Sequence, residues 1–428
     1  MSAQAGLVIM LVAFFIPLFF SVPIAISLGI ASIAVILGMN LVPPSFMIQT
    51  LFLSTDSFSM LAIPFFILAG DLMLQGGISN RLVNFARLLV GHVPGSMGLV
   101  TVLASMFFAA LSGSGPATVA AIGGIMIPVM VKDKYDKAFS CTLAACAGSM
   151  GPIIPPSICF VMYGIAAGVS IGDLFTAGFI PGFLMALTLC IIVLIFSKVR
   201  GYGTVHPRAS AKEILRGFKD AFLALLMPVI ILGGIYSGFF SPTESAVIAC
   251  DYALILGLFV YKEIRLRDLP AIIAKTALTC GSCLIMVATA SCFGKVITLM
   301  GVPKMLADAI YSVSTNLYVI LVLINILLFI TGMFMETTAA ILILAPLLLE
   351  IVRPLGMNPI HFGIMMVVNL VIGMCTPPVG CNLFIAARIG GIKLENMFKW
   401  LFPMVGALLI VVLLVTYIPQ ISLLLLGG

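Results

Sequence analysis

Apolar stretches close to the length of a membrane span fill most of the sequence, and short polar segments separate them. The continuous stretches cover residues 58–76, 174–197, 221–240, 243–261, 271–300 and 400–421. A helix needs about 20 apolar residues to cross a bilayer, whereas stretches of about 10–14 are typical of buried helices in soluble proteins. Residues 6–20 and 22–39 form either two short spans or one long kinked span. The pattern therefore predicts an all-α polytopic membrane protein.

Two longer apolar segments are each interrupted near the middle by small and polar residues. The interruption in residues 97–131 contains Ser112, Gly113, Ser114, Gly115 and Thr118, and the one in residues 317–352 contains Gly332, Glu336, Thr337 and Thr338. Each side of the first interruption has about 14 residues, which rise only about 21 Å as a helix and cross a bilayer poorly. Each segment is therefore predicted to be a re-entrant helical hairpin with its tip near mid-membrane.

Two further apolar segments contain adjacent prolines. The break in residues 138–168 contains Gly151, Pro152, Pro155, Pro156 and Ser157, and the break in residues 361–389 contains Gly373, Thr376, Pro377 and Pro378, with Asn382 just after it. Adjacent prolines remove backbone donors and move the preceding residue out of the helical region, so each helix must stop and restart. Irregular backbone persists at membrane depth only inside protein or beside a polar cavity. Two broken transmembrane helices in matching positions predict a transporter's binding site.

The two halves of the chain repeat at a constant offset. Five pairs are 222 residues apart, namely Pro155 and Pro377, Pro156 and Pro378, Gly168 and Gly390, Asp173 and Glu395, and Pro181 and Pro403. Repeated capping and kinking without a shared site is the alternative explanation. The most polar stretch, residues 198–219, divides the halves and is predicted to be a cytoplasmic connection.

Composition and charge agree with a membrane location and orient the repeats. Hydrophobic residues make up 62% of the 428 and charged residues 8%, against roughly a quarter charged in soluble domains. The net charge of +6 comes from Lys and Arg in connecting segments, which is the positive-inside pattern and gives no indication of a nucleic-acid partner. With the basic connections in the cytoplasm, the two hairpins open to opposite sides, as inverted repeats require.

The residues at the tips and breaks suit an anion and a sodium ion. The N-termini of half-helices carry partial positive charge and free amides, which favour a carboxylate, whereas C-terminal ends and unwound carbonyls favour Na⁺. Hydroxyls and amides at the breaks add neutral oxygen ligands. The first hairpin and both breaks lack Asp and Glu, so sodium coupling is predicted instead of a proton relay, with no other metal and no cofactor. No nucleophile and base can be placed together, so the chain is not predicted to be an enzyme.

Two embedded carboxylates have structural explanations. Ser241 and Glu244 flank Pro242 in the pattern of a complete capping box, and this structural role is predicted for them. Glu336 lies where an acid favours the start of the following half-helix, and it either caps that helix or lines the pocket.

Taken in order, these segments resemble the large membrane subunit (DctM-like, M subunit) of tripartite ATP-independent periplasmic (TRAP) transporters, within the ion transporter superfamily. The resemblance covers essentially the whole chain, and it rests on residues 62–70, 91–95, 112–118, 151–157, 240–246 and 374–380 together with Asn382. It implies a multi-pass protein of the bacterial inner membrane that is driven by Na⁺ and moves by an elevator mechanism. It also implies Na⁺ ligands at residues 112–115, 151–157, 332–338 and 373–378.

The resemblance further implies how the chain is divided and with what it works. Scaffold helices would occupy residues 1–95 and 220–315, and the halves of a mobile transport domain would occupy residues 96–197 and 316–428. Substrate would come from a soluble periplasmic (P type) binding protein, and a small four-helix (Q type) membrane subunit would pack on the scaffold. Some relatives carry that subunit fused in front; this chain has no such extension, so a separate subunit is expected.

The resemblance leaves the substrate open between two kinds of organic acid. Residues 112–118, 361–365 and 373–375 are more similar to C4-dicarboxylate members, while residues 239–245 are also similar to sialic acid members. The alternatives to a partnered importer are a stand-alone Na⁺/anion symporter, which would need no binding protein, and a passive channel, which would not accumulate substrate.

Overall fold

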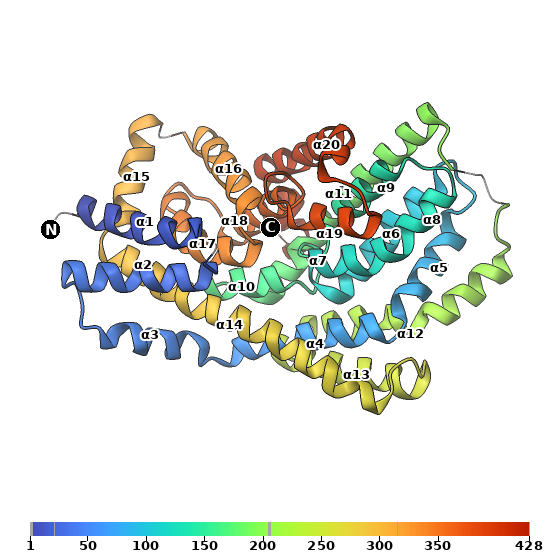
Figure 1. Ribbon diagram of the computed structural model, residues 1–428, viewed down its shortest axis with the longest axis horizontal. Coiled ribbons are helices and arrows are strands. Elements are labelled where there is room, and N and C mark those ends of the chain that lie inside the picture. The colour runs from blue at the N-terminus through green and yellow to red at the C-terminus, as the bar shows by residue number, and fades with distance from the viewer. Residues whose placement is uncertain (1–2, 21, 204–206, 315, 428) are drawn as a thin grey trace.

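The computed structural model describes residues 3–20, 22–203, 207–314 and 316–427, and these ranges contain helices and turns but no strand (Figure 1). The helices of the first half are α1 (Ala3–Phe19), α2 (Ile24–Met39), α3 (Ser45–Thr55), α4 (Ala62–Gln75), α5 (Ile78–Val90), α6 (Ser96–Ser112), α7 (Gly115–Thr118), α8 (Gly124–Lys132), α9 (Lys137–Gly148), α10 (Ile158–Ala167) and α11 (Ile171–Arg200). Those of the second half are α12 (Ala211–Tyr236), α13 (Pro242–Ile255), α14 (Leu269–Leu299), α15 (Val302–Val313), α16 (Leu317–Phe334), α17 (Thr337–Val352), α18 (Pro359–Gly373), α19 (Cys381–Gly390), α20 (Phe398–Tyr417) and the short α21 (Gln420–Leu423).

Within the described ranges, eight helical segments are long and apolar enough to cross a membrane. The prediction of an all-α polytopic protein is therefore confirmed. The helices α1 and α2 are separate and pack on each other, so the N-terminal apolar region is not one long kinked span.

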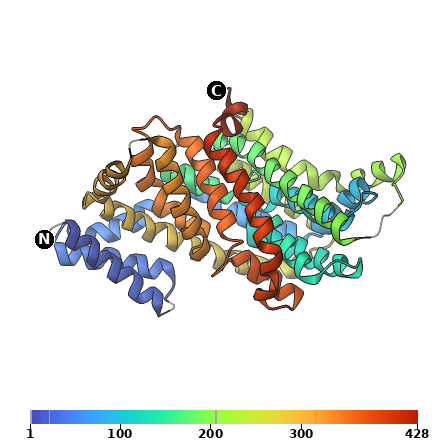
Figure 2. The ribbon, with the colours of Figure 1, turned by 90° about the horizontal axis from the view of Figure 1, so that it is seen from above.

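The helices form two contact groups that alternate along the chain. In one group, α14 contacts α2, α3 and α4, while α13 contacts α4 and α12. In the other group, α9 contacts α6 and α19, and α18 contacts α11, α16, α17 and α20. The groups meet where α17 packs on α14 and where α6 packs on α4 and α5. Viewed down its shortest axis and from above, the molecule has α1 and α2 at one end of its long axis and the start of α12 at the other (Figures 1 and 2).

Three helices lie outside the long apolar stretches of the sequence, namely α3, α5 and α15. The helix α5 is an example. It buries one face, including Leu82 and Phe85, and keeps Arg87 exposed on another. Such a helix has a short apolar stripe and no continuous apolar run.

The polar stretch between the halves is partly helical. A capping box begins α12, in which the Ser210 backbone N–H donates to Glu213 Oε2 over 2.7 Å and the Glu213 N–H donates to Ser210 Oγ over 3.2 Å. Residues 211–219 of the predicted 198–219 connection are therefore helical, because this cap starts the helix before the apolar run. Residues 204–206 of that connection lie outside the described residues.

An ion pair joins α4 to α14. Lys275 Nζ lies 2.6 Å from Asp71 Oδ1, and the Thr276 hydroxyl donates to Asp71 Oδ2 over 2.9 Å. The Asp71 side chain is 12% exposed and the Lys275 side chain 57%. The Asp71 carboxylate is therefore held between the Lys275 and Thr276 side chains of α14, while the Lys275 side chain remains more than half exposed.

Replacing Lys275 by Met is expected to lower the midpoint of thermal unfolding of the purified protein. Because Lys275 is more than half exposed, the expected loss is only ~1 kcal/mol. Lys304→Met on α15 is the matched control, since Lys304 makes no ion pair among the described residues. Equal midpoints for Lys275→Met and Lys304→Met would show that the pair contributes nothing to stability.

Candidate functional site

The tip between α6 and α7 is organised by its own hydroxyl groups. The Ser112 and Thr118 hydroxyl oxygens are 3.0 Å apart, and the Thr118 hydroxyl donates to the Ser114 carbonyl over 2.8 Å. Gly113 adopts a positive φ of 58° at the turn, a conformation that suits glycine. The first predicted hairpin tip is thus a compact loop whose oxygens are held at defined positions.

This tip packs backbone against backbone on the first helix break. A Cβ placed on Gly113 would lie 2.8 Å from the Pro156 carbonyl oxygen and 3.2 Å from the Ile158 nitrogen. A Cβ placed on Gly151 would overlap the Ser114 carbonyl and lie 2.8 Å from the Gly115 nitrogen. Two glycines therefore permit the closest approach of tip and break.

The first break runs between α9 and α10, and residues 149–157 are buried throughout. Ser157 caps α10, because its hydroxyl accepts the Phe160 N–H over 3.2 Å. The same hydroxyl donates to the Pro152 carbonyl. Ser157 thus satisfies backbone groups on both sides of a break that has little access to water.

The second tip and break meet in the same way. A Cβ on Gly332 would lie 2.6 Å from the Leu370 carbonyl oxygen, and a Cβ on Gly373 would lie 2.6 Å from the Gly332 carbonyl carbon. The Val379 N–H donates to the Met333 carbonyl over 3.2 Å. Gly373 is 222 residues after Gly151, the offset of the five pairs in the sequence, and each of these glycines packs on the tip of its own half.

Glu336 is the N-cap of α17. Its Oε2 accepts the backbone N–H groups of Thr338 over 2.9 Å and of Ala339 over 3.2 Å, and it also accepts the Thr338 hydroxyl. Of the two roles predicted for Glu336, this geometry is that of the cap, although its side chain remains exposed at the tip. The neighbouring Thr337 is buried, with its hydroxyl 2.8 Å from Met374 Sδ in the second break.

The second break is more open than the first. Thr376 is half-buried, and its hydroxyl donates to the Ile372 carbonyl over 3.0 Å. Pro378 and Val379 are exposed, whereas every residue of the first break is buried. The two breaks therefore differ in accessibility although their sequences match.

Asn382 joins the two halves of the site. Its Nδ2 donates to the Ala145 carbonyl on α9 over 3.4 Å, and a Cβ on Gly115 of the first tip would lie 3.3 Å from its Oδ1. The side chain is 0% exposed, and its Oδ1 has no hydrogen-bond partner in the described structure. Buried acceptors are normally paired, so this oxygen is available to a further partner.

The predicted site residues thus fall into two packed groups. The first group consists of Ser112, Gly113, Ser114, Gly115, Thr118, Gly151, Pro152, Pro155, Pro156, Ser157 and Asn382, and the second of Gly332, Glu336, Thr337, Thr338, Gly373, Thr376, Pro377 and Pro378. Ser241 and Glu244 lie apart from both groups, at the start of α13, where they form a capping box. The sequence reasoning missed Ala145 and Cys375. Cys375 Sγ donates to the same Ala145 carbonyl over 3.3 Å.

Helix ends of both polarities surround these groups. The N-termini of α7, α10, α17 and α19 and the C-termini of α6, α9, α16 and α18 all lie at the tips and breaks. Among the described residues, no three His, Cys, Asp or Glu side chains are placed to hold a metal ion. Apart from the exposed Glu336 carboxylate, which caps α17, the donors present are neutral oxygens and helix dipoles, which can bind an anion and a weakly coordinated monovalent cation.

Comparison with known proteins gives the family. Residues 11–421 match the family described as "Tripartite ATP-independent periplasmic transporter, DctM component". The chain belongs to this family. It is a TRAP large permease, and like its relatives it is a multi-pass protein of the bacterial inner membrane. This family works with a small membrane subunit and a periplasmic binding protein.

Individual relatives are similar over most of the permease. The isethionate TRAP transporter permease protein DctMQ of Oleidesulfovibrio alaskensis is 46% identical over 94% of this chain, and the match spans 63% of the relative's length. The C4-dicarboxylate large permease DctM of Pseudomonas aeruginosa is 43% identical over 87% of both chains. The sialic acid large permease SiaM of Vibrio cholerae is 40% identical over 95% of both.

Two solved transporters share the fold at low sequence identity. The Alcanivorax borkumensis YdaH transporter superposes with a TM-score of 0.64 at 15% identity, covering 87% of the permease and 88% of YdaH. Neisseria gonorrhoeae MtrF superposes with a TM-score of 0.59 at 13% identity, covering 87% of the permease and 82% of MtrF. At this identity the likeness concerns the fold alone.

Proposed function

We propose that this permease is a Na⁺-coupled secondary importer of a small organic-acid anion. The observation that carries the proposal is the buried, unpartnered Asn382 Oδ1 between the first tip and the second break, among neutral oxygens and the ends of eight half-helices. Helix N-termini favour the anion and helix C-termini favour the cation. Each positive charge that moves inward supplies about 2.3 kcal/mol per 100 mV, which drives accumulation of the anion.

The names of the relatives support a proposed substrate class. Those compared above are named for isethionate, C4-dicarboxylates and sialic acid, all of which are organic anions. We propose a carboxylate of C4-dicarboxylate or sialic acid type, delivered by a periplasmic binding protein and moved with the help of a small Q-type membrane subunit. A stand-alone symporter would instead accept free substrate, and a passive channel would only equilibrate it.

The two contact groups of helices support an elevator movement. The group that contains both tips and both breaks would be the moving transport domain, and the group around α4, α13 and α14 the fixed scaffold. The hairpins would be re-entrant and the halves inverted repeats, with Gly151 and Gly373 as equivalent packing positions.

Replacing Ser114 or Thr376 by alanine is expected to weaken Na⁺ binding, so that uptake needs a higher Na⁺ concentration. Each change removes one hydroxyl oxygen beside the proposed ion sites, with an expected cost of ~1 kcal/mol, or roughly a fivefold rise in the Na⁺ concentration for half-maximal uptake. The measurement is a sodium titration of uptake in proteoliposomes.

Thr188→Ala on α11 is the control for Thr376→Ala. The Thr188 hydroxyl makes the same type of bond to the carbonyl four residues back, over 2.8 Å, but it lies outside both tips and breaks. An unchanged sodium titration in both Ser114→Ala and Thr376→Ala would show that these two hydroxyls are not ligands of Na⁺.

A further inference from the structure

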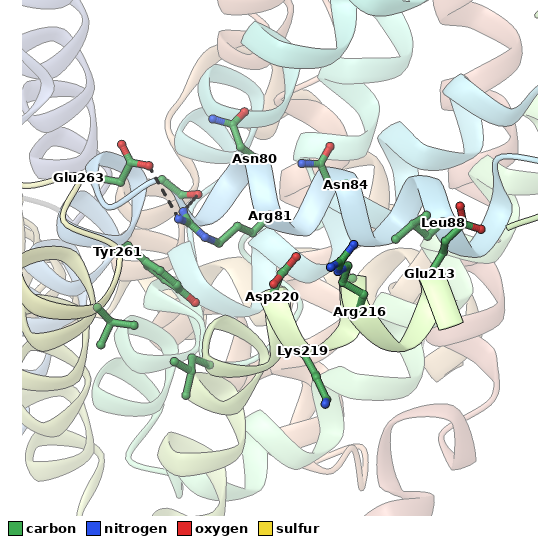
Figure 3. A pocket seen from close by; sticks show the side chains of 14 residues that line it. Asn80, Arg81, Asn84, Leu88, Glu213, Arg216, Lys219, Asp220, Tyr261 and Glu263 are labelled. Carbon is green, nitrogen blue, oxygen red and sulfur yellow. Dashed lines mark hydrogen bonds and ion pairs between the residues drawn. The ribbon is translucent and has the colours of Figure 1, made fainter. Parts of the chain in front are cut away.

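A charged cavity of about 750 Å³ lies outside the proposed transport site, between α5, α12 and the segment that follows α13 (Figure 3). Its charged lining consists of three cations, Arg81, Arg216 and Lys219, and three anions, Glu213, Asp220 and Glu263. Asn80 and Asn84 of α5 add neutral donors and acceptors. The cavity therefore presents both cationic and anionic groups, as binding of a ligand that carries both signs requires.

The guanidinium of Arg81 is held in a defined orientation. It donates to the Gly77 carbonyl over 2.8 Å, lies 3.8 Å from the carboxylate of Glu263, and is centred 3.8 Å from the ring centroid of Tyr261. Figure 3 shows Arg81 reaching toward Glu263, with Tyr261 beside it. The Arg81 side chain is 26% exposed and that of Glu263 51%. The cavity therefore has one anchored cation, while its anion remains accessible.

The cavity lies beside the ends of two apolar helical segments. The helix α12 becomes apolar directly after Asp220, and the apolar segment of α13 ends at Val260. The basic residues of α5 and of the start of α12 collect at this end of the spans, which by the positive-inside rule is the cytoplasmic side. The ligand would thus be found at the level of the cytoplasmic headgroups.

Apolar side chains complete the lining of the cavity. Leu88, Leu223 and Val260 line the cavity itself. Elsewhere on the same helical segments, Phe222 on α12 is 43% exposed and Phe259 after α13 is 69% exposed. A charged cavity with apolar lining residues, on helices that also expose apolar side chains, matches a ligand with a polar head and acyl chains.

We propose that this cavity binds the headgroup of a zwitterionic phospholipid of the phosphatidylethanolamine type. Arg216 and Lys219 would bind the phosphate, and Asp220 and Glu263 would accept hydrogen bonds from the ammonium. A purely anionic headgroup would bring no cation to Asp220 and would leave Glu263 with Arg81 as its only cation, and a trimethylated ammonium has no N–H to donate. The lipid would bridge the amphipathic α5 and the span α12.

The test is a binding titration of the purified chain in detergent, with bound lipid read by native mass spectrometry. The lipids compared are phosphatidylethanolamine, phosphatidylcholine and phosphatidylglycerol, all with identical acyl chains. Water-soluble glycerophosphoethanolamine is added as a competitor. Phosphatidylethanolamine is expected to bind at least about tenfold more tightly than the other two lipids, the effect of one or two charge-assisted hydrogen bonds. Equal binding of the three lipids by the wild-type chain overturns the proposal, as does displacement of lipid by equimolar glycerophosphoethanolamine.

Variants then assign the two ends of the headgroup. Glu263→Gln and Asp220→Asn are expected to reduce the preference for phosphatidylethanolamine over phosphatidylcholine, whereas Arg216→Gln is expected to weaken all three phospholipids. Glu395→Gln, an exposed carboxylate on the transport-domain group of helices, is the control and should bind as the wild type does. An unchanged preference in both Glu263→Gln and Asp220→Asn would contradict the assignment.

Discussion

Replacing Gly151 by alanine is expected to reduce uptake by at least tenfold. The new Cβ would overlap the Ser114 carbonyl and lie 2.8 Å from the Gly115 nitrogen. Both are backbone atoms of the first tip, so no side chain can rotate away, and overpacking of this kind costs about 1–3 kcal/mol. The tip must then move off the break, and the proposed ion and substrate positions, which depend on their contact, would move with it.

Gly373→Ala is expected to have the same effect in the second half, because its Cβ would lie 2.6 Å from the Gly332 carbonyl carbon and 3.0 Å from the Met333 nitrogen. Gly124→Ala on α8 and Gly406→Ala on α20 are matched controls, since an added Cβ at either meets nothing within 4 Å. Uptake by proteoliposomes, normalised to the amount of folded protein, is the measurement. Wild-type uptake in both Gly151→Ala and Gly373→Ala would show that the contact between tip and break is not needed for transport.

Replacing Asn382 by leucine is expected to raise the Na⁺ concentration for half-maximal uptake by about tenfold or to abolish uptake. The substitution keeps a similar volume but removes the unpartnered Oδ1 and the donor to the Ala145 carbonyl. A lost ligand or an unsatisfied buried polar group costs about 1–3 kcal/mol, which corresponds to this change in affinity. The sodium titration separates a lost ion ligand from a general loss of activity.

Asn325→Leu on α16 is the control for Asn382→Leu. Asn325 is also buried, and its Nδ2 donates to the Leu321 carbonyl over 2.8 Å and to the Thr416 hydroxyl over 3.2 Å. Its replacement is expected to lower thermal stability while leaving the sodium titration unchanged. A wild-type sodium titration in Asn382→Leu would exclude Asn382 from the ion site.

Much of the fold follows from residues with strong local effects. Adjacent prolines mark both breaks, and α9 ends at Gly148 and α18 at Gly373, just before them. Ser241 and Glu244 fix the start of α13 through backbone hydrogen bonds that involve only neighbours in sequence. Such features depend on a few adjacent residues, so a single sequence contains enough information to predict them.

Other features depend on partners that leave no local pattern. Asn382 contacts a backbone carbonyl 237 residues away, and any residue at position 145 would offer the same acceptor. The amphipathic α5 and α15 lack the long apolar runs that mark a span. The burial of the first break and the exposure of the second arise from the packing of whole helices, so two matching proline motifs cannot predict the difference.

Uptake by proteoliposomes that contain this chain and its small membrane partner, under an inward Na⁺ gradient, tests the proposed function most directly. Succinate and sialic acid are each offered with and without the cognate periplasmic binding protein. We predict accumulation above the external concentration of one of them, only when both the sodium gradient and the binding protein are present. Accumulation without the binding protein would identify a stand-alone symporter, and equilibration without accumulation would identify a passive channel. Either result would contradict the proposed sodium-driven, binding-protein-dependent import.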